Sequence, residues 1–204
     1  MLRTPSWDEG EWGMSKLVCH LESFLGKTNC AWAGIPGLQE IGVQIGQYDS
    51  APFGVPLALS TLGLSLHPLR SASSGEIIFH ELLMFASEPC EPLNIPAILA
   101  QIASGTVRRK RPLLRGDVVG PQGGGLLEKS SMEAFFVTLP ILLPPEFAAA
   151  EDEEGRGIAL AWLIPISAKE AAWARSQGWE AFEEALDKQN PELLNWYRDE
   201  MRLQ

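Results

Sequence analysis

Histidine, cysteine and long apolar runs are all scarce in this sequence of 204 residues, and each scarcity excludes a class of protein. The three histidines, His20, His67 and His80, fall in three different predicted elements. His20 follows Cys19 directly, but adjacent helix positions point in different directions, so the two side chains make a poor chelate. His80 and Glu81 are adjacent in a predicted strand, where successive side chains point to opposite faces. The sequence therefore predicts neither a metal site nor a histidine–carboxylate pair.

The three cysteines, Cys19, Cys30 and Cys90, are an odd number and lie far apart, which argues against a disulfide framework. The longest apolar run, FFVTLPILLPPEF at residues 135–147, is interrupted by prolines and falls short of the roughly 20 apolar residues that span a bilayer. The first residues, MLRTPSWDEGEWG, lack the apolar core of a signal peptide. We therefore expect a reduced, cytoplasmic protein that does not contact a membrane.

Two glycine-containing segments do not match the catalytic or phosphate-binding motifs that they resemble. GLS, at residues 63–65, is half of a nucleophile elbow, but the second glycine is missing. GPQGGG, at residues 120–125, lacks the lysine and the Ser or Thr of a phosphate-binding loop. One alternative remains open, a small cytoplasmic, hydrolase-like enzyme whose site is assembled from scattered residues, with His67, His80 and Asp117 as candidates. That hypothesis requires at least two of the three to meet in one pocket.

Basic residues are also few, since 16 Lys and Arg stand against 26 Asp and Glu and give a formal net charge of −10. A chain with this charge repels nucleic acid and anionic membranes, so we expect no nucleic-acid partner. The basic run at residues 108–111 is interpreted as a solvated turn that follows a helix. An acidic cluster consists of Glu151, Asp152, Glu153 and Glu154. This cluster is either solvated surface or a place where a cation or a basic partner binds.

Apolar residues are abundant, at 46% of the chain with seven Trp and eight Phe, so we expect one hydrophobic core and a single domain over residues 1–204. Helix-like periodicity occurs at residues 15–25, 95–104, 168–177, 179–189 and 191–203, and strand-like runs at 41–48, 55–66, 76–85, 113–121, 133–143 and 158–164. The predicted fold class is α+β or mixed α/β. It has a central mixed sheet of about five or six strands flanked by helices, and a helical C-terminal third.

The segment IALAWLIPISAKEAAWARSQGWEAFE, at residues 158–183, passes from a strand to a helix within a few residues. Pro165 is expected to end the strand. Ser167 and Glu170 form the S-x-x-E pattern of a capping box, in which each side chain satisfies a free backbone N–H of the other residue. Gly178 is expected to end the helix. We interpret this junction as architectural, with no role in catalysis.

Several segments in this order resemble the Suppressor of fused family in its bacterial form, over about residues 40–200. They are LSTLGLSLHPL (59–69), GEIIFHELLMF (75–85), NIPAILAQIA (94–103), LLRGDVVGP (113–121), FFVTLPILLPPEF (135–147) and WLIPISAKEAAWARSQGWEAFEEAL (162–186). The last is the most specific, because a strand ending in proline is followed by a serine-capped helix, a glycine and a second helix.

The resemblance implies a mixed α/β domain that binds another protein and has no catalytic centre and no cofactor. Many bacterial relatives look like immunity proteins that neutralise a toxin, and the acidic balance of this chain suits a basic toxin as partner. The acidic cluster Glu151–Glu154 is then the first candidate for part of the binding surface. None of the eukaryotic partner-binding residues has a matching motif in this chain, so none is transferred.

Overall fold

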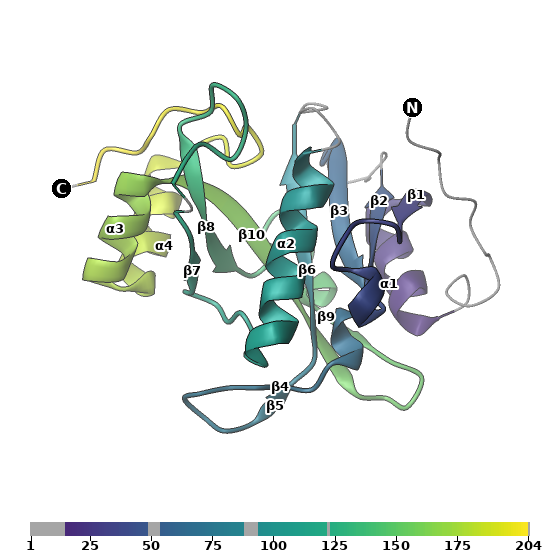
Figure 1. Ribbon diagram of the computed structural model, residues 1–204. Coiled ribbons are helices and arrows are strands. Elements are labelled where there is room, and N and C mark those ends of the chain that lie inside the picture. Colours follow the sequence, from purple (N-terminus) through teal and green to yellow (C-terminus); the bar gives the residue numbers. More distant parts are fainter. Residues whose placement is uncertain (1–14, 49–53, 88–93, 122, 204) are drawn as a thin grey trace.

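The structure is a computed structural model that describes residues 15–48, 54–87, 94–121 and 123–203 (Figure 1). Its helices are α1 (Lys16–Leu25), α2 (Asn94–Arg109), α3 (Ala168–Gln177) and α4 (Trp179–Gln189), with short 3-10 turns η1 (Gln39–Ile41), η2 (Leu64–Leu66) and η3 (Pro145–Ala148). Its strands are β1 (Thr28–Trp32), β2 (Gln44–Tyr48), β3 (Leu57–Leu62), β4 (Leu69–Arg70), β5 (Ile77–Ile78), β6 (His80–Ala86), β7 (Val118–Val119), β8 (Met132–Thr138), β9 (Ala149–Glu151) and β10 (Gly157–Ser167). Of the turn predicted at residues 49–54, residues 49–53 lie outside the described residues, and so does Cys90.

Eight of these strands form one sheet in the order β1-β2-β3-β6-β10-β8-β7, and β9 pairs with β10 beside this path. β10 runs parallel to β6, and the other neighbouring pairs are antiparallel. The predicted mixed sheet is therefore confirmed. It has more strands than expected because β1 and β9 lie in segments that were interpreted as loops. β4 and β5 pair only with each other, as a separate hairpin.

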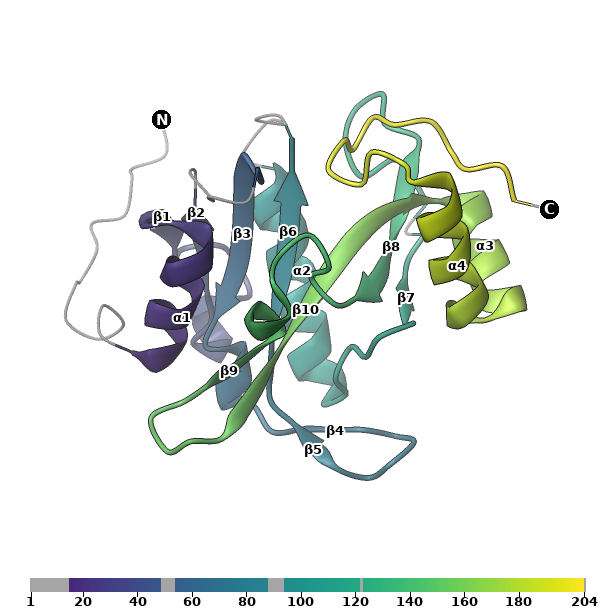
Figure 2. The same cartoon turned by 180° about the vertical axis from the view of Figure 1, so that it is seen from behind.

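Alternate residues of the central strands enter two different cores, one on each face of the sheet. In β10, Ile158, Leu160, Trp162 and Ile164 belong to the core beneath α1, α3 and α4, whereas Ala161 and Leu163 belong to the core beneath α2. The same alternation in β6 separates Leu83 and Phe85 from Leu82 and Met84. Figures 1 and 2 show these helices on the two sides of the sheet. Residues 76–85, apolar on both alternating sets of positions, were expected to form one strand covered on both faces. β6 confirms this from His80 onward, whereas Ile77 and Ile78 belong to the separate β5.

The helix boundaries follow local signals except in α2. Ser15 caps α1, its side chain accepting the N–H of Val18 at 3.2 Å. α2 continues past Gly105, which was expected to end it, to Arg109. The buried face persists through Thr106, whose hydroxyl donates to the Ile102 carbonyl at 2.9 Å. The first half of the basic run is thus the last turn of a helix, where cations complement the helix dipole.

Two proline-containing strands end elsewhere than predicted. β8 stops at Thr138 and not at residue 143, because Pro140 cannot donate to a neighbouring strand and the chain turns away there. β10 continues through Pro165 to Ser167, so the prediction that this proline ends the strand is wrong. β10 pairs with β6 only as far as Trp162, so at Pro165 the strand has β8 as its one neighbour. A proline is tolerated at such an open edge.

The predicted third C-terminal helix does not form. Asn190 instead ends α4 with a left-handed backbone (φ 44°), and residues 191–203, named here the C-terminal strap, run as turns and extended chain. Tertiary hydrogen bonds replace helical ones, since the Leu194 carbonyl accepts the N–H of Ser87 at 2.9 Å. The Trp196 indole is buried and donates to the Phe85 carbonyl at 2.9 Å. These contacts of Leu194 and Trp196 with the sheet therefore outweigh the Asn190–Pro191 pattern, which favours the start of a helix.

Candidate functional site

The acidic cluster lies at the turn between β9 and β10, which we call the acidic hairpin. Asp152 shapes this turn, because its carboxylate accepts the backbone N–H groups of Glu154 (2.9 Å) and Arg156 (2.8 Å) and pairs with the Arg156 guanidinium (2.6 Å). Glu153 accepts the N–H of Lys16 at 2.8 Å, which satisfies a free donor in the first turn of α1. These two acids therefore serve the fold.

Glu151, Glu153 and Glu154 are the exposed members of the acidic hairpin. Glu153 is already bonded to α1, which leaves the carboxylates of Glu151 and Glu154. The Glu154 carboxylate lies 3.6 Å from the Arg156 guanidinium, a solvent-screened contact of small energetic value. Both side chains are available to a partner. The role of the hairpin in binding remains a prediction.

The three residues of the enzyme hypothesis do not come together. His80 is buried in β6, whereas Asp117 precedes β7, and β10 and β8 lie between these two strands. Three strand spacings amount to about 14 Å. The Asp117 carboxylate accepts the N–H of Leu114 at 2.9 Å within its own turn, and the His67 ring contacts the Ile41 carbonyl at 2.7 Å. No pair of them has the geometry of an acid–base dyad.

The GLS segment has a structural function that the sequence analysis missed. Glu81 is fully buried, and its carboxylate accepts the backbone N–H groups of Gly63 (3.1 Å), Leu64 (3.2 Å) and Ser65 (3.0 Å) and the Thr61 hydroxyl. Burial raises the pKa of Glu81 to about 7, although these hydrogen bonds act in the opposite direction. The carboxylate caps the η2 turn from inside the protein, out of reach of any ligand at the surface.

Within the described part of the chain, no group of three or more His, Cys, Asp or Glu side chains is arranged to hold a metal ion. Over the same residues, no helix is long and apolar enough to cross a membrane. Cys19 is exposed and Cys30 is partly buried, and within the described residues neither forms a disulfide.

A groove of about 620 Å³ is lined by residues of α4, the C-terminal strap and the turn that follows β8, and we call it the α4 groove. Its base includes Ile164 of β10 and Leu186 of α4. The remaining lining residues are Ser87, Thr138, Ile141, Leu142, Glu183, Asp187, Asn190, Pro191, Glu192, Leu193, Leu194 and Asn195. Its volume and mostly apolar lining are typical of sites that bind a ligand or an anchoring side chain.

One side of the α4 groove is an apolar turn exposed to solvent. The N–H of Leu143 donates to the Pro140 carbonyl at 3.0 Å, and this bond closes a turn whose two central residues are Ile141 and Leu142. Ile141 is 63% exposed and Leu142 39% exposed, and Leu139 beside them is 42% exposed. Turn centres normally carry Gly, Asn, Asp or Ser, so three exposed aliphatic side chains here form an unusual apolar surface.

The opposite side of the α4 groove is acidic. Asp187 and Glu192 are exposed, and among the described residues no lysine or arginine lines the groove. Glu183 lies deeper, where it accepts hydrogen bonds from the Thr138 hydroxyl (2.7 Å) and Arg115 Nε (2.9 Å). Burial would raise the pKa of Glu183, but the bonds from Arg115 and Thr138 hold that pKa below its usual range. The two exposed acids are therefore the charges that the groove presents to a ligand.

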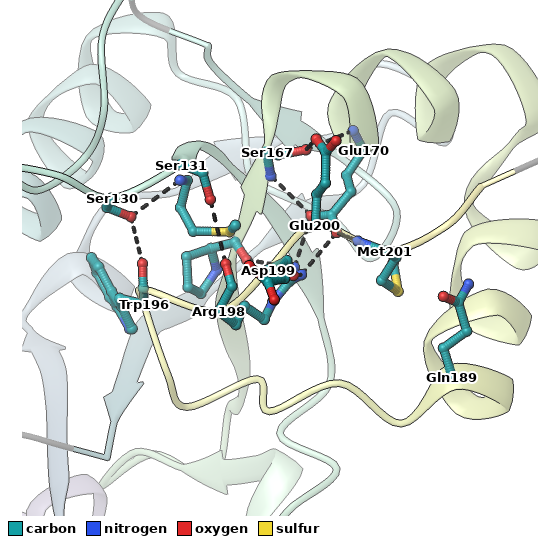
Figure 3. A network of polar contacts seen from close by, with 12 residues as sticks. Ser130, Ser131, Ser167, Glu170, Gln189, Trp196, Arg198, Asp199, Glu200 and Met201 are labelled. Atoms are coloured by element: carbon teal, nitrogen blue, oxygen red, sulfur yellow. Dashed lines mark hydrogen bonds and ion pairs between the residues drawn. The ribbon is translucent and has the colours of Figure 1, made fainter.

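A buried ion pair holds the strap that forms the third side (Figure 3). The Glu170 carboxylate accepts both terminal nitrogens of Arg198 at 2.8 Å each and also the N–H of Met201 at 2.7 Å. The predicted capping box is present, with Ser167 N–H bonded to Glu170 at 2.9 Å. One residue of the cap thus also fixes the strap, a role that the S-x-x-E pattern alone does not indicate.

The α4 groove could not be predicted from the sequence, because the three sides of the groove come from segments that are far apart in the chain. One signal was present, since LPILLPP places aliphatic residues between prolines that prevent regular pairing. That segment was interpreted as the end of a buried strand.

The Suppressor of fused protein (SUFU) family model matches residues 42–199 of this chain. No curated protein sequence matches this chain. Among solved structures, a Suppressor of fused homologue from Neisseria gonorrhoeae superimposes with a TM-score of 0.70 at 19% identity, covering 93% of this chain and 96% of the other. Drosophila Suppressor of fused superimposes with a TM-score of 0.67 at 14% identity, covering 91% of this chain and 50% of the longer Drosophila chain.

A third solved structure is a Sufu–Fu complex, which superimposes with a TM-score of 0.63 at 15% identity and covers 92% of this chain and 89% of the other. At these identities the solved structures show a shared fold. The family match extends over more than three quarters of the sequence and agrees with the order of segments found above. The chain belongs to the Suppressor of fused family.

Proposed function

We propose that this chain is a non-catalytic module that binds a basic protein and neutralises it. The observation that carries the proposal is that a structure of the same fold was solved as a complex, Sufu with Fu. The separation of His67, His80 and Asp117 supports a binding function over an enzymatic one.

The net charge of −10 favours a basic partner, since complementary charge accelerates association and disfavours acidic competitors. A cytoplasmic toxin such as a nuclease, which needs positive charge to hold nucleic acid, has this chemistry. We therefore propose an immunity-like role in which the acidic protein masks the basic surface of the toxin. Both partners would act in the cytoplasm, where the thiols of this chain stay reduced.

Part of the contact surface is assigned to the acidic hairpin. Glu151 and Glu154 are exposed there, while Asp152 and Glu153 keep the turn in place. A rigid turn that presents two carboxylates loses little conformational entropy when it meets a basic surface.

The proposal is tested by affinity capture with the purified protein from lysate of its own source, at low and at moderate salt, followed by mass spectrometry. A single stoichiometric basic protein is expected, retained more weakly at moderate salt because exposed charges are screened. The captured protein is then produced alone, and the complex is reconstituted from the two pure components. Failure of the folded chain to retain any protein at either salt concentration would contradict the proposal.

The assignment of the hairpin is tested separately on that reconstituted complex. Glu151→Lys with Glu154→Lys should weaken binding and flatten its salt dependence. Glu40→Lys, an exposed acid on η1, serves as the matched charge-reversal control. Unchanged affinity and unchanged salt dependence in the hairpin variant would remove the hairpin from the binding surface.

A further inference from the structure

We propose that the α4 groove is a docking site for an extended basic segment of a partner protein, a segment in which an aliphatic anchor is flanked by lysines or arginines. The inference rests on the proposed protein-binding function and adds to it a second surface and the chemistry of its ligand. In both Figure 1 and Figure 2, α4 and the C-terminal strap lie on the opposite side of the molecule from the turn between β9 and β10 that carries the acidic hairpin.

The apolar half of the recognition comes from the turn after β8 and the base of the groove. Ile141 and Leu142 are exposed beside a base formed by Ile164 and Leu186. Covering this surface removes apolar area from water at about 25 cal/mol per Å², so an aliphatic anchor gains free energy there. A volume of about 620 Å³ is large enough for such an anchor and its neighbouring backbone.

The charged half of the recognition comes from α4 and the C-terminal strap. Asp187 and Glu192 stand at the rim, and the part of the chain that the structure describes places no basic side chain in the lining to neutralise them. The groove therefore attracts cations beside an apolar anchor and repels acidic segments. This combination of charges selects a basic segment.

The groove is held in shape before any ligand binds. Arg115 and Thr138 fix Glu183 of α4, and the Arg115 guanidinium stacks 4.8 Å from the ring of Trp179. The buried Glu170–Arg198 pair anchors the strap a few residues beyond the part that lines the groove. A preformed site loses little free energy to ordering when it is occupied.

A synthetic peptide with alternating leucine and lysine is the first probe, and its counterpart with glutamate in place of lysine is the control. The protein carries labelled Ile and Leu methyl groups and is titrated by NMR. Saturable binding with one peptide per protein is expected, with methyl shifts confined to Ile141, Leu142, Ile164 and Leu186 and their neighbours. The glutamate peptide should produce no such shifts.

Variants then separate charge from apolar contact. Asp187→Lys with Glu192→Lys should lower the affinity for the lysine peptide about tenfold or more. Glu184 does not line the groove, so Glu184→Lys should change this affinity about twofold or less. Ile141→Ser with Leu142→Ser should also lower the affinity for the lysine peptide about tenfold. Leu66 is 60% exposed outside the groove, so Leu66→Ser should leave this affinity unchanged. The hairpin variant Glu151→Lys with Glu154→Lys should bind the peptide as the wild type does.

The inference would be overturned if the groove variants and their controls lost the same peptide affinity. It would also be overturned if the methyl shifts were spread over the surface, or if the lysine peptide did not bind. Binding of zwitterionic lipid vesicles that displaces the peptide would overturn it too, because the apolar turn would then be a lipid contact. If the groove variants still capture the stoichiometric partner from lysate with unchanged affinity, the groove assignment fails while the protein-binding function stands.

Discussion

At the scale of single residues, Glu170 has the greatest influence on the C-terminal third. Its buried carboxylate accepts four hydrogen bonds, from Ser167, from Met201 and from two nitrogens of Arg198. Glu170→Gln leaves the buried guanidinium of Arg198 without a counter-charge and should lower the free energy of unfolding by about 3–5 kcal/mol. Ser167→Ala removes only the capping hydroxyl and should cost about 1 kcal/mol. Urea denaturation measures both.

Lys169→Gln is the matched control, because it breaks an exposed ion pair with Glu200 and should cost less than about 1 kcal/mol. Replacing both buried partners, Glu170→Met with Arg198→Met, should be less destabilising than either single change, since no uncompensated charge remains. A loss in Glu170→Gln no larger than that in Ser167→Ala would show that the ion pair does not hold the strap.

His80 predicts a dependence of stability on pH. Burial lowers the pKa of His80 to about 4, because the cationic ring would lose its hydration. The unfolded chain binds the proton near pH 6.5, so stability present above pH 6.5 is lost as the pH falls from 6.5 toward 4. A pKa lowered by about 2.5 units corresponds to about 3 kcal/mol over that range.

The neighbouring Glu81 acts in the opposite direction, because its raised pKa of about 7 makes the folded protein bind a proton more tightly between pH 4.5 and 7. The His80 effect is therefore measured as a difference. The free energy of unfolding of the wild type minus that of His80→Leu should fall by about 3 kcal/mol between pH 7 and pH 4. A difference that does not change with pH would mean that His80 is protonated inside the fold.

At the scale of elements, the attachment of α4 depends on Gly116. The residue has φ +91°, and an added Cβ would lie 2.6 Å from the Trp179 side chain at the start of α4. Gly42 also has a positive φ (+64°), but nothing lies within 4 Å of a Cβ there. Gly42→Ala should cost about 1 kcal/mol for the backbone alone, and Gly116→Ala about 2–4 kcal/mol because strain and overlap add. If thermal denaturation showed the same loss of stability for both variants, a steric overlap between the added Cβ and Trp179 would be excluded.

Elements whose boundaries depend on local chemistry could be predicted from the sequence. Ser15 and Gly26 bound α1, and Ser167 and Gly178 bound α3, because caps act through backbone groups a few residues away. The predicted end of the strand at Pro165 was wrong because a proline ends a strand only where a neighbouring strand needs its missing N–H. Its carbonyl accepts Arg198 at 3.2 Å, so that edge of β10 faces the C-terminal strap and not a strand.

The candidate sites were predicted only where they are contiguous in sequence. The acidic hairpin is four consecutive residues, so composition was enough to find it. The α4 groove joins Thr138, Ile164 and Leu186 with the strap, and these neighbours depend on the order of strands in the sheet. Strand order follows from tertiary packing, which no local pattern in a single sequence records.

At the scale of the whole molecule, the acidic hairpin and the α4 groove should affect different steps of binding. Glu151 and Glu154 are exposed charges on the β9–β10 turn, which Figure 2 shows on the other side of the molecule from α4, so we expect them to steer the encounter with a basic partner. Ile141 and Leu142 offer short-range apolar contacts, so we expect them to slow dissociation. The two surfaces share no residue, and their effects should therefore add.

The corresponding experiment measures association and dissociation rates of the reconstituted partner complex by surface plasmon resonance. Glu151→Lys with Glu154→Lys changes the formal charge from −10 to −6, and it should lower the association rate several-fold at low salt and much less near about 0.15 M, where charges are screened beyond about 8 Å. Ile141→Ser with Leu142→Ser should raise the dissociation rate at both salt concentrations, because apolar contact is not screened by salt. If the serine variant instead changed the association rate alone, the groove would not be holding the partner.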